Sequence, residues 1–145
     1  NKLFALEMAQ YMETAYYTAQ QQEVPAFLKP GEDTATISKN AKEEKVATNI
    51  AGFYALECGL SYLATAQHKL PSAVLQAIVN DSLNAKNKKL FERFANATWK
   101  AGQPFRGLER ITREVFIPFD LLSKEEQEKD WVQIKAAAEK MLQSL

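Results

Sequence analysis

Apolar residues recur at every third or fourth position along most of this chain, which is the spacing of one face of an α-helix. The first such stretch predicts a helix from about Lys2 to Glu23. Its predicted buried face consists of Phe4, Met8, Tyr11, Met12, Ala15 and Ala19. Helix-ending residues follow at Pro25, Pro30 and Gly31.

The second stretch predicts the central helix of the fold. Its start lies between Asp33 and Asn40, because either Asp33 or an Asn40 and Glu43 capping box can satisfy the first backbone amides. It ends near His68. Apolar residues between 46 and 63 point almost all round the helix, which requires neighbouring helices to cover most of its surface.

A third helical region opens at Pro71 and continues to about Ala101, and the polar residues 80–84 can divide it in two. Residues 111–119 predict an extended connector rather than a strand, since no second β-like run exists to pair with them. The last helix begins after Ser123. Its predicted core face is Trp131, Ile134, Ala138, Met141 and Leu145.

These elements predict an all-α fold, most simply an up-and-down bundle of about four main helices with a long extended connector before the last one. A chain of 145 residues is long enough for one core, so we expect a single domain over residues 1–145.

The balance of charges excludes some partners. Because 18 basic residues face 18 acidic ones, there is no overall field to attract nucleic acid, and we expect no extended nucleic-acid surface. No apolar run is long enough for a transmembrane segment. The sequence begins at Asn1 rather than methionine, so we expect an upstream piece to have been removed. A secretory signal peptide is one candidate for it, which leaves localisation open between the cytoplasm and export.

Catalytic and metal-binding patterns are missing from the sequence. With one histidine, one cysteine and no Glu-x-x-His spacing, we expect neither a zinc nor a di-iron site, and no cofactor is indicated. Glu57 is the most isolated carboxylate, flanked by apolar residues in the helix expected to be most buried. It is therefore the candidate buried polar residue, used in proton transfer or ligand anchoring by an enzyme with a pocket around it. The alternatives are that it hydrogen-bonds to a tyrosine or a basic side chain, or that it lies on the one solvent-exposed edge of that helix.

A basic run lies between Lys86 and Arg113, which contains eight lysines and arginines but only two glutamates, Glu92 and Glu109, with Glu114 directly after it. The candidate ligand-binding residues in it are Trp99, Phe105, Arg106, Arg110 and Arg113. Arginines supply forked donors for a phosphate and aromatic rings supply a stacking surface, so this run predicts a site for a small anion such as a nucleotide. The alternative is an ordinary solvated helix face.

The segment from Ile117 to Trp131 carries a capped helix start, with Ser123 and Glu126 spaced as a capping box. Together with the preceding helix it resembles the ryanodine receptor repeat domain over about residues 89–145. The similar positions are Trp99, Pro118, Phe119, Leu122, Glu126 and Asp130. This chain departs from that family where the Gly-Trp-x-Tyr-Gly loop is reduced to Gly102, Phe105 and Gly107, where Arg113-Glu114 replaces His-Pro, and at Ser123, where proline is common.

Two functions follow from these features. The first is a non-enzymatic interaction or sensing module that binds a small anionic ligand. The second is an exported adaptor or structural bundle that binds a protein partner or its own copy. The apolar patch that would mediate the second contains Tyr11, Tyr16, Tyr17, Phe27 and Leu28.

Overall fold

A computed structural model describes residues 2–23 and 43–145, apart from the side chains of residues 2–5, 43–45 and 105. The described residues form helices and loops without a strand, which confirms the all-α fold class. The helices are α1 (Lys2–Ala19), α3 (Glu43–Gln67), α4 (Pro71–Val79), α5 (Ala85–Arg106), α6 (Lys124–Glu128) and α7 (Trp131–Gln143). Two short 3-10 helices, η1 (Leu108–Thr112) and η2 (Phe119–Leu121), lie in the connector.

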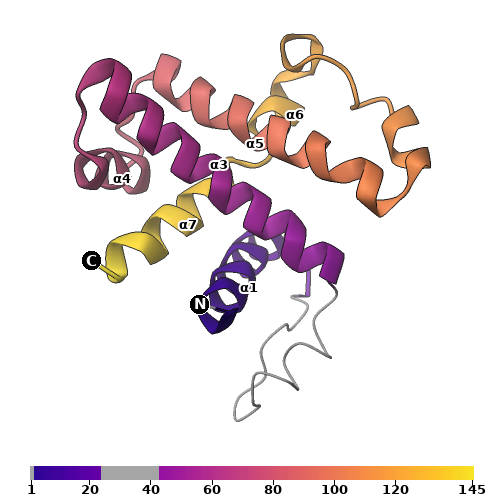
Figure 1. Cartoon of the computed structure of the whole chain (residues 1–145), viewed down its shortest axis with the longest axis horizontal. Helices are drawn as coiled ribbons and strands as arrows, with labels where there is room; N and C mark the ends of the chain where they lie inside the picture. The colour runs from indigo at the N-terminus through magenta and orange to yellow at the C-terminus, as the bar shows by residue number, and fades with distance from the viewer. Residues whose placement is uncertain (1, 24–42) are drawn as a thin grey trace.

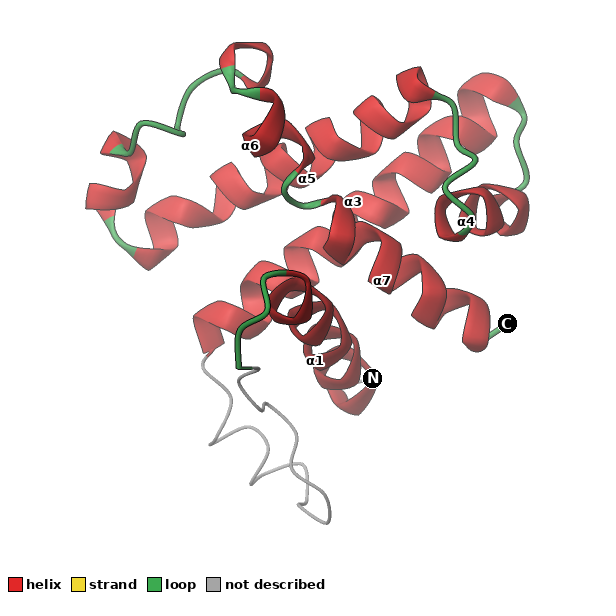
Figure 2. Cartoon of the chain, turned by 180° about the vertical axis from the view of Figure 1, so that it is seen from behind, coloured by secondary structure: helices red, strands yellow, loops and turns green. Residues whose placement is uncertain are grey.

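The most extensive packing joins α3 to α5, which lie side by side in both ribbon views (Figures 1 and 2). Gly59 of α3 allows this approach, because a Cβ atom there would lie 2.1 Å from the ring of Phe91. Phe91 is fully buried and belongs to the main core cluster. The central position predicted for the second helix is therefore confirmed.

The first and last helices close the other side of the bundle. Helix α1 packs against α7 and α3, and α4 packs against α7 (Figure 2). Met8 and Met12 of α1 enter the same core as Trp131 and Ile134 of α7. The two ends of the chain are thereby brought together, which matters for the site described below. None of the described helices is both long enough and apolar enough to span a lipid bilayer.

Several helix boundaries differ from those predicted. Helix α1 ends at Ala19, before Glu23, while the predicted start of the second helix lies outside the described residues. The third region is divided, as its polar residues indicated, and the side chain of Asn84 caps α5 by accepting from the backbone N–H of Asn87 at 2.8 Å. The last region was wrongly predicted as one helix, since α6 and α7 are separated at Lys129 and Asp130.

The connector is less extended than predicted, because η1 and η2 fold parts of it into tight turns. It leaves the far end of α5 and returns to α6 beside the middle of that helix (Figure 1). Phe119 and Leu122 are buried, so apolar side chains anchor its last part to the bundle. The cap at Ser123 is confirmed, since its hydroxyl accepts from the N–H of Glu126 at 3.2 Å.

Candidate functional site

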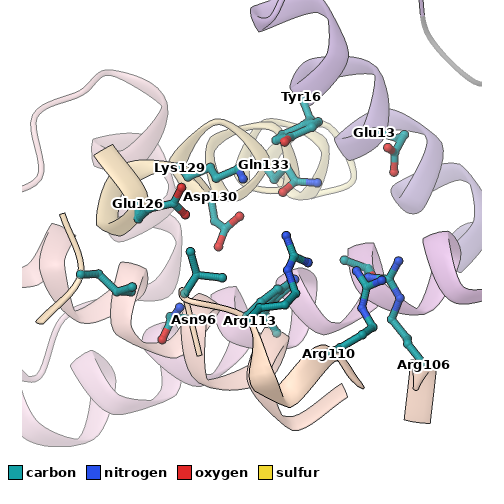
Figure 3. Close-up of a pocket in the computed structure, with 14 residues that line it drawn as sticks. Glu13, Tyr16, Asn96, Arg106, Arg110, Arg113, Glu126, Lys129, Asp130 and Gln133 are labelled. Carbon is teal, nitrogen blue, oxygen red and sulfur yellow. The ribbon is translucent and has the colours of Figure 1, made fainter. Parts of the chain in front are cut away.

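A pocket of about 300 Å³ lies where α1, α3, α5, the connector and the α6–α7 junction meet (Figure 3). This volume is at the lower end of the range for small-molecule sites. Four of the five candidate ligand-binding residues line it, namely Trp99, Arg106, Arg110 and Arg113. Phe105, the fifth, has its side chain outside the described part of the structure.

The three arginines form one wall of the pocket, called here the arginine wall. Arg106 is the last residue of α5, Arg110 lies in η1 and Arg113 follows it. Gly107 produces the turn between them with φ of 148°, a value that side-chain-bearing residues rarely adopt. The turn therefore brings the side chains of Arg106, Arg110 and Arg113, which belong to different elements, to the same pocket.

Hydrogen bonds and ring contacts orient this wall. Arg110 donates from Nε to Oε1 of Gln103 at 2.8 Å, and Gln103, which is only 1% exposed, donates to the backbone oxygen of Trp99 at 3.0 Å. The guanidinium of Arg113 lies 5.8 Å from the centre of the Trp99 ring, within the range of a cation–π contact. The arginines are therefore positioned against a fixed aromatic platform.

The opposite side of the pocket carries Glu13, Glu126 and Asp130, called here the acidic wall (Figure 3). Lys129 also lines the pocket, so the lining has one more basic than acidic side chain. None of these carboxylates was predicted as a binding residue from the sequence. Glu13 lies in the first helix and Asp130 begins the last one, so only the tertiary fold brings them to the arginines.

Glu13 is held by a chain of amides. It is 3% exposed and accepts a hydrogen bond from Nδ2 of Asn49, whose Oδ1 accepts from Nε2 of Gln133 at 2.7 Å. Asn49 is itself 1% exposed. This network links α1, α3 and α7 at one side of the pocket and fixes where the Glu13 carboxylate lies.

Burial raises the pKa of the Asp130 carboxyl above its ordinary value of 3.8, Lys129 opposes this increase, and Glu126 adds to it. A desolvated carboxylate of this kind gains free energy from a cationic or hydrogen-bond-donating partner. In the described part of the chain, no ion pair joins Arg110 or Arg113 to a carboxylate of the acidic wall. The two walls thus face one space without neutralising each other directly.

Three other members of the basic run have structural roles. Arg93 forms an ion pair with Asp120, Lys100 donates to the backbone oxygen of Ile117, and Lys89 donates to Gln127 at 2.7 Å. These contacts hold the connector and α6 on α5. Within the basic run, Lys89, Arg93 and Lys100 therefore hold the connector and α6, whereas the arginines from Arg106 onward line the pocket.

The prediction that Glu57 is buried was wrong. Its side chain is exposed, as are those of Cys58 and Ser61 beside it. Although the apolar residues of α3 point in most directions, no neighbouring helix covers this side of it, and Glu57 lines neither of the two pockets found among the described residues. Nor do any three His, Cys, Asp or Glu side chains in the described ranges form a group that could hold a metal ion.

The apolar patch predicted to bind a protein partner is only partly exposed in its described residues. Tyr11 is half-buried and donates a hydrogen bond to Glu139 of α7 at 2.9 Å. Tyr16 and Tyr17 stand edge to face with ring centres 5.6 Å apart, and Tyr16 lines the pocket. Phe27 and Leu28 lie outside the described residues.

Comparisons with known proteins add no relative: no protein-family model, curated protein or solved structure matches this chain.

Proposed function

We propose that this protein is a non-enzymatic helical module that binds a small phosphate-bearing ligand, such as a nucleotide, in the pocket between the arginine and acidic walls. The observation that carries the proposal is the convergence of Arg106, Arg110 and Arg113 beside Trp99 in one pocket. Guanidinium groups bind phosphate through paired, charge-assisted hydrogen bonds. The indole ring supplies a surface on which a base can stack.

The ryanodine receptor repeat resemblance fits the same proposal. Four of the six similar positions line this pocket, namely Trp99, Leu122, Glu126 and Asp130. Phe119, another of the six, is buried where the connector packs against α5. We propose that the segment resembling this family forms the ligand site, with α1 and α3 completing it.

The test is a thermal-shift panel of inorganic phosphate, adenosine monophosphate and adenosine. A ligand that binds only the folded chain, at a concentration of about 100 times Kd, stabilises it by about 2.7 kcal/mol. We expect the two phosphate compounds to raise the melting temperature by several degrees and adenosine to raise it less. The proposal fails if neither phosphate compound changes the midpoint.

Paired variants identify the site. Arg110→Ala with Arg113→Ala should abolish the shift, because it removes two phosphate donors. Lys86→Ala with Lys124→Ala removes the same charge from exposed positions outside the pocket and should keep it. Equal loss in both pairs would indicate nonspecific attraction to positive charge.

An interaction surface for a protein partner or a second copy is the other proposal. On α3, Tyr54 and Tyr62 are 57% and 49% exposed, and Cys58 between them is also exposed. Such aromatic side chains are enriched at protein interfaces. Light scattering across a concentration series tests self-association: a mass that stays at one chain, 16.4 kDa, would contradict it.

A further inference from the structure

A phosphate bound to the arginine wall would not pair with the carboxylates of the acidic wall on the other side of the pocket. Glu13, Glu126 and Asp130 line the same 300 Å³ as the arginines. Figure 3 shows the carboxylates of Glu13 and Asp130 directed toward the arginine side of the pocket. An anion bound at the arginines would therefore lie close to buried negative charge, which weakens its binding unless that charge is also paired.

Two carboxylates of the acidic wall, those of Glu13 and Asp130, are not neutralised by an ion pair. Glu13 is 97% buried and accepts a hydrogen bond from an amide, Nδ2 of Asn49. In the part of the chain that the structure describes, no ion pair involves Glu13 or Asp130. Burial also raises the pKa of Asp130. Desolvated carboxylates in this condition bind a cationic group strongly, because a charge-assisted hydrogen bond replaces the lost water.

We infer that the ligand is bipolar: it carries a phosphate that binds the arginine wall and a protonated amine that binds Glu13 and Asp130. This inference rests on the proposed function and specifies the chemical class of the ligand. The amine hydrogens donate to the carboxylate oxygens of the acidic wall, while the phosphate oxygens accept from Arg110 and Arg113. Tyr16 and Gln133 line the pocket beside Glu13 and Asp130 and offer further polar contacts.

The arrangement also defines what the site rejects. A ligand with two phosphates brings one of them toward the acidic wall, and a diamine brings one amine toward the arginines. Both meet like charge at short range, which disfavours binding. Selectivity for the bipolar ligand follows from repulsion as well as attraction.

Calorimetric titration with matched compounds tests the inference on the full chain. The probes are 2-aminoethyl phosphate and 3-aminopropyl phosphate, compared with ethyl phosphate and propyl phosphate. We expect at least one aminoalkyl phosphate to bind about tenfold more tightly than the alkyl phosphate of the same length, which is the gain from one additional charged hydrogen bond. The two spacer lengths allow for the separation of the walls.

Variants then assign the gain to the acidic wall. Glu13→Gln and Asp130→Asn should each reduce the preference for the amine while ethyl phosphate still binds, which also shows that the variant is folded. Glu125→Gln removes a charge from an exposed position outside the pocket and should leave the preference unchanged.

The possible failures are distinguishable. If aminoalkyl and alkyl phosphates bind equally, the bipolar ligand is wrong and the phosphate site stands. If the preference for the amine persists in both Glu13→Gln and Asp130→Asn, the acidic wall does not recognise it and the inference is overturned. If none of the four compounds binds, the proposed function fails together with the inference.

Discussion

The side chain of Arg110 is fixed by Gln103, which accepts a hydrogen bond from its Nε over 2.8 Å. Gln103 is almost fully buried and is tied in turn to the backbone of Trp99. One turn of α5 therefore sets both the aromatic platform of the pocket and the direction of an arginine that lies beyond the end of the helix. This relationship makes Gln103 a positioning residue that can act without touching the ligand.

Replacing Gln103 with leucine should weaken phosphate binding, because Arg110 is still present but its side chain is no longer held by a hydrogen bond. Freeing an arginine side chain costs about 1 kcal/mol when the ligand must order it again, which is roughly fivefold in Kd. Calorimetric titration of Gln103→Leu, Arg110→Ala and the double variant gives the coupling between the two residues. We expect Gln103→Leu to have little further effect once Arg110 is absent. Additive losses would mean that Gln103 acts independently of Arg110.

Alanine substitutions at two glycines, one in α3 and one in α5, should change the free energy of unfolding in opposite directions. Gly59→Ala places a methyl group against the buried ring of Phe91 and should lower the free energy of unfolding by about 1 to 3 kcal/mol. Gly102→Ala, in α5, meets no atom within 4 Å and should raise it by about 0.5 to 1 kcal/mol through helix propensity. Urea denaturation of both variants measures this. A neutral Gly59→Ala would show that the two helices are not packed so closely.

Glu92 gives a pH-dependent prediction. Its side chain is 3% exposed, and its Oε2 atom has no hydrogen-bond partner among the described residues. Burial raises the pKa of this carboxyl above the ordinary 4.5, although Lys89 and Lys88 nearby lower it. The folded state therefore favours the protonated acid. Its unfavourable contribution to stability is absent below pH 4.5, grows as pH rises from 4.5 to the higher folded pKa, and is complete above that pKa.

Glu92→Gln should accordingly stabilise the fold at neutral pH by about 1 kcal/mol, since it removes a poorly paired buried charge. The gain should shrink at pH 4, where Glu92 in the unmodified chain is protonated. Denaturation curves at the two pH values measure it. Lower stability of Glu92→Gln at pH 7 would mean that the Lys89 contact outweighs the burial.

The connector should loosen when its ion pair is removed. Arg93 lowers the pKa of Asp120, so this pairing is present above the ordinary aspartate value of 3.8 and is lost as pH falls through the lower folded pKa. In Asp120→Asn, the amides of Leu121 and Leu122, which are bonded in η2, should exchange with solvent faster. Glu125→Gln is the control of equal charge. Unchanged exchange at both amides would show that the other contacts of the segment, such as the buried Phe119 and the hydrogen bonds from Gln127, hold it without the ion pair.

Helix periodicity was sufficient to predict the fold class and the central position of the second helix, and the polar residues 80–84 indicated the break after Val79. Periodicity did not predict the interruption between α6 and α7 at Lys129 and Asp130. Neither residue is a glycine or a proline, so the sequence has no local signal for a helix end there. Periodicity also placed Glu57 in the core. Apolar neighbours in sequence indicate the character of a helix but not which neighbouring helix covers each side.

The arginine half of the site was predictable because Arg106, Arg110 and Arg113 are close in sequence and stand near an aromatic residue. The acidic half was not, since Glu13 and Asp130 are far apart in the chain and each resembles an ordinary surface carboxylate. Only the packing of α1 against α7 brings them together. Interactions between distant segments leave no local signal.

Arginine side-chain NMR tests the central claim most directly. In a titration with inorganic phosphate, the Nε–Hε signals of Arg110 and Arg113 should shift along a saturable curve, because both guanidinium groups line the pocket. The signal of Arg93, which is paired with Asp120 outside the pocket, should stay in place. Signals of Arg110 and Arg113 that do not move, or that move no more than that of Arg93, would contradict a phosphate site in this pocket.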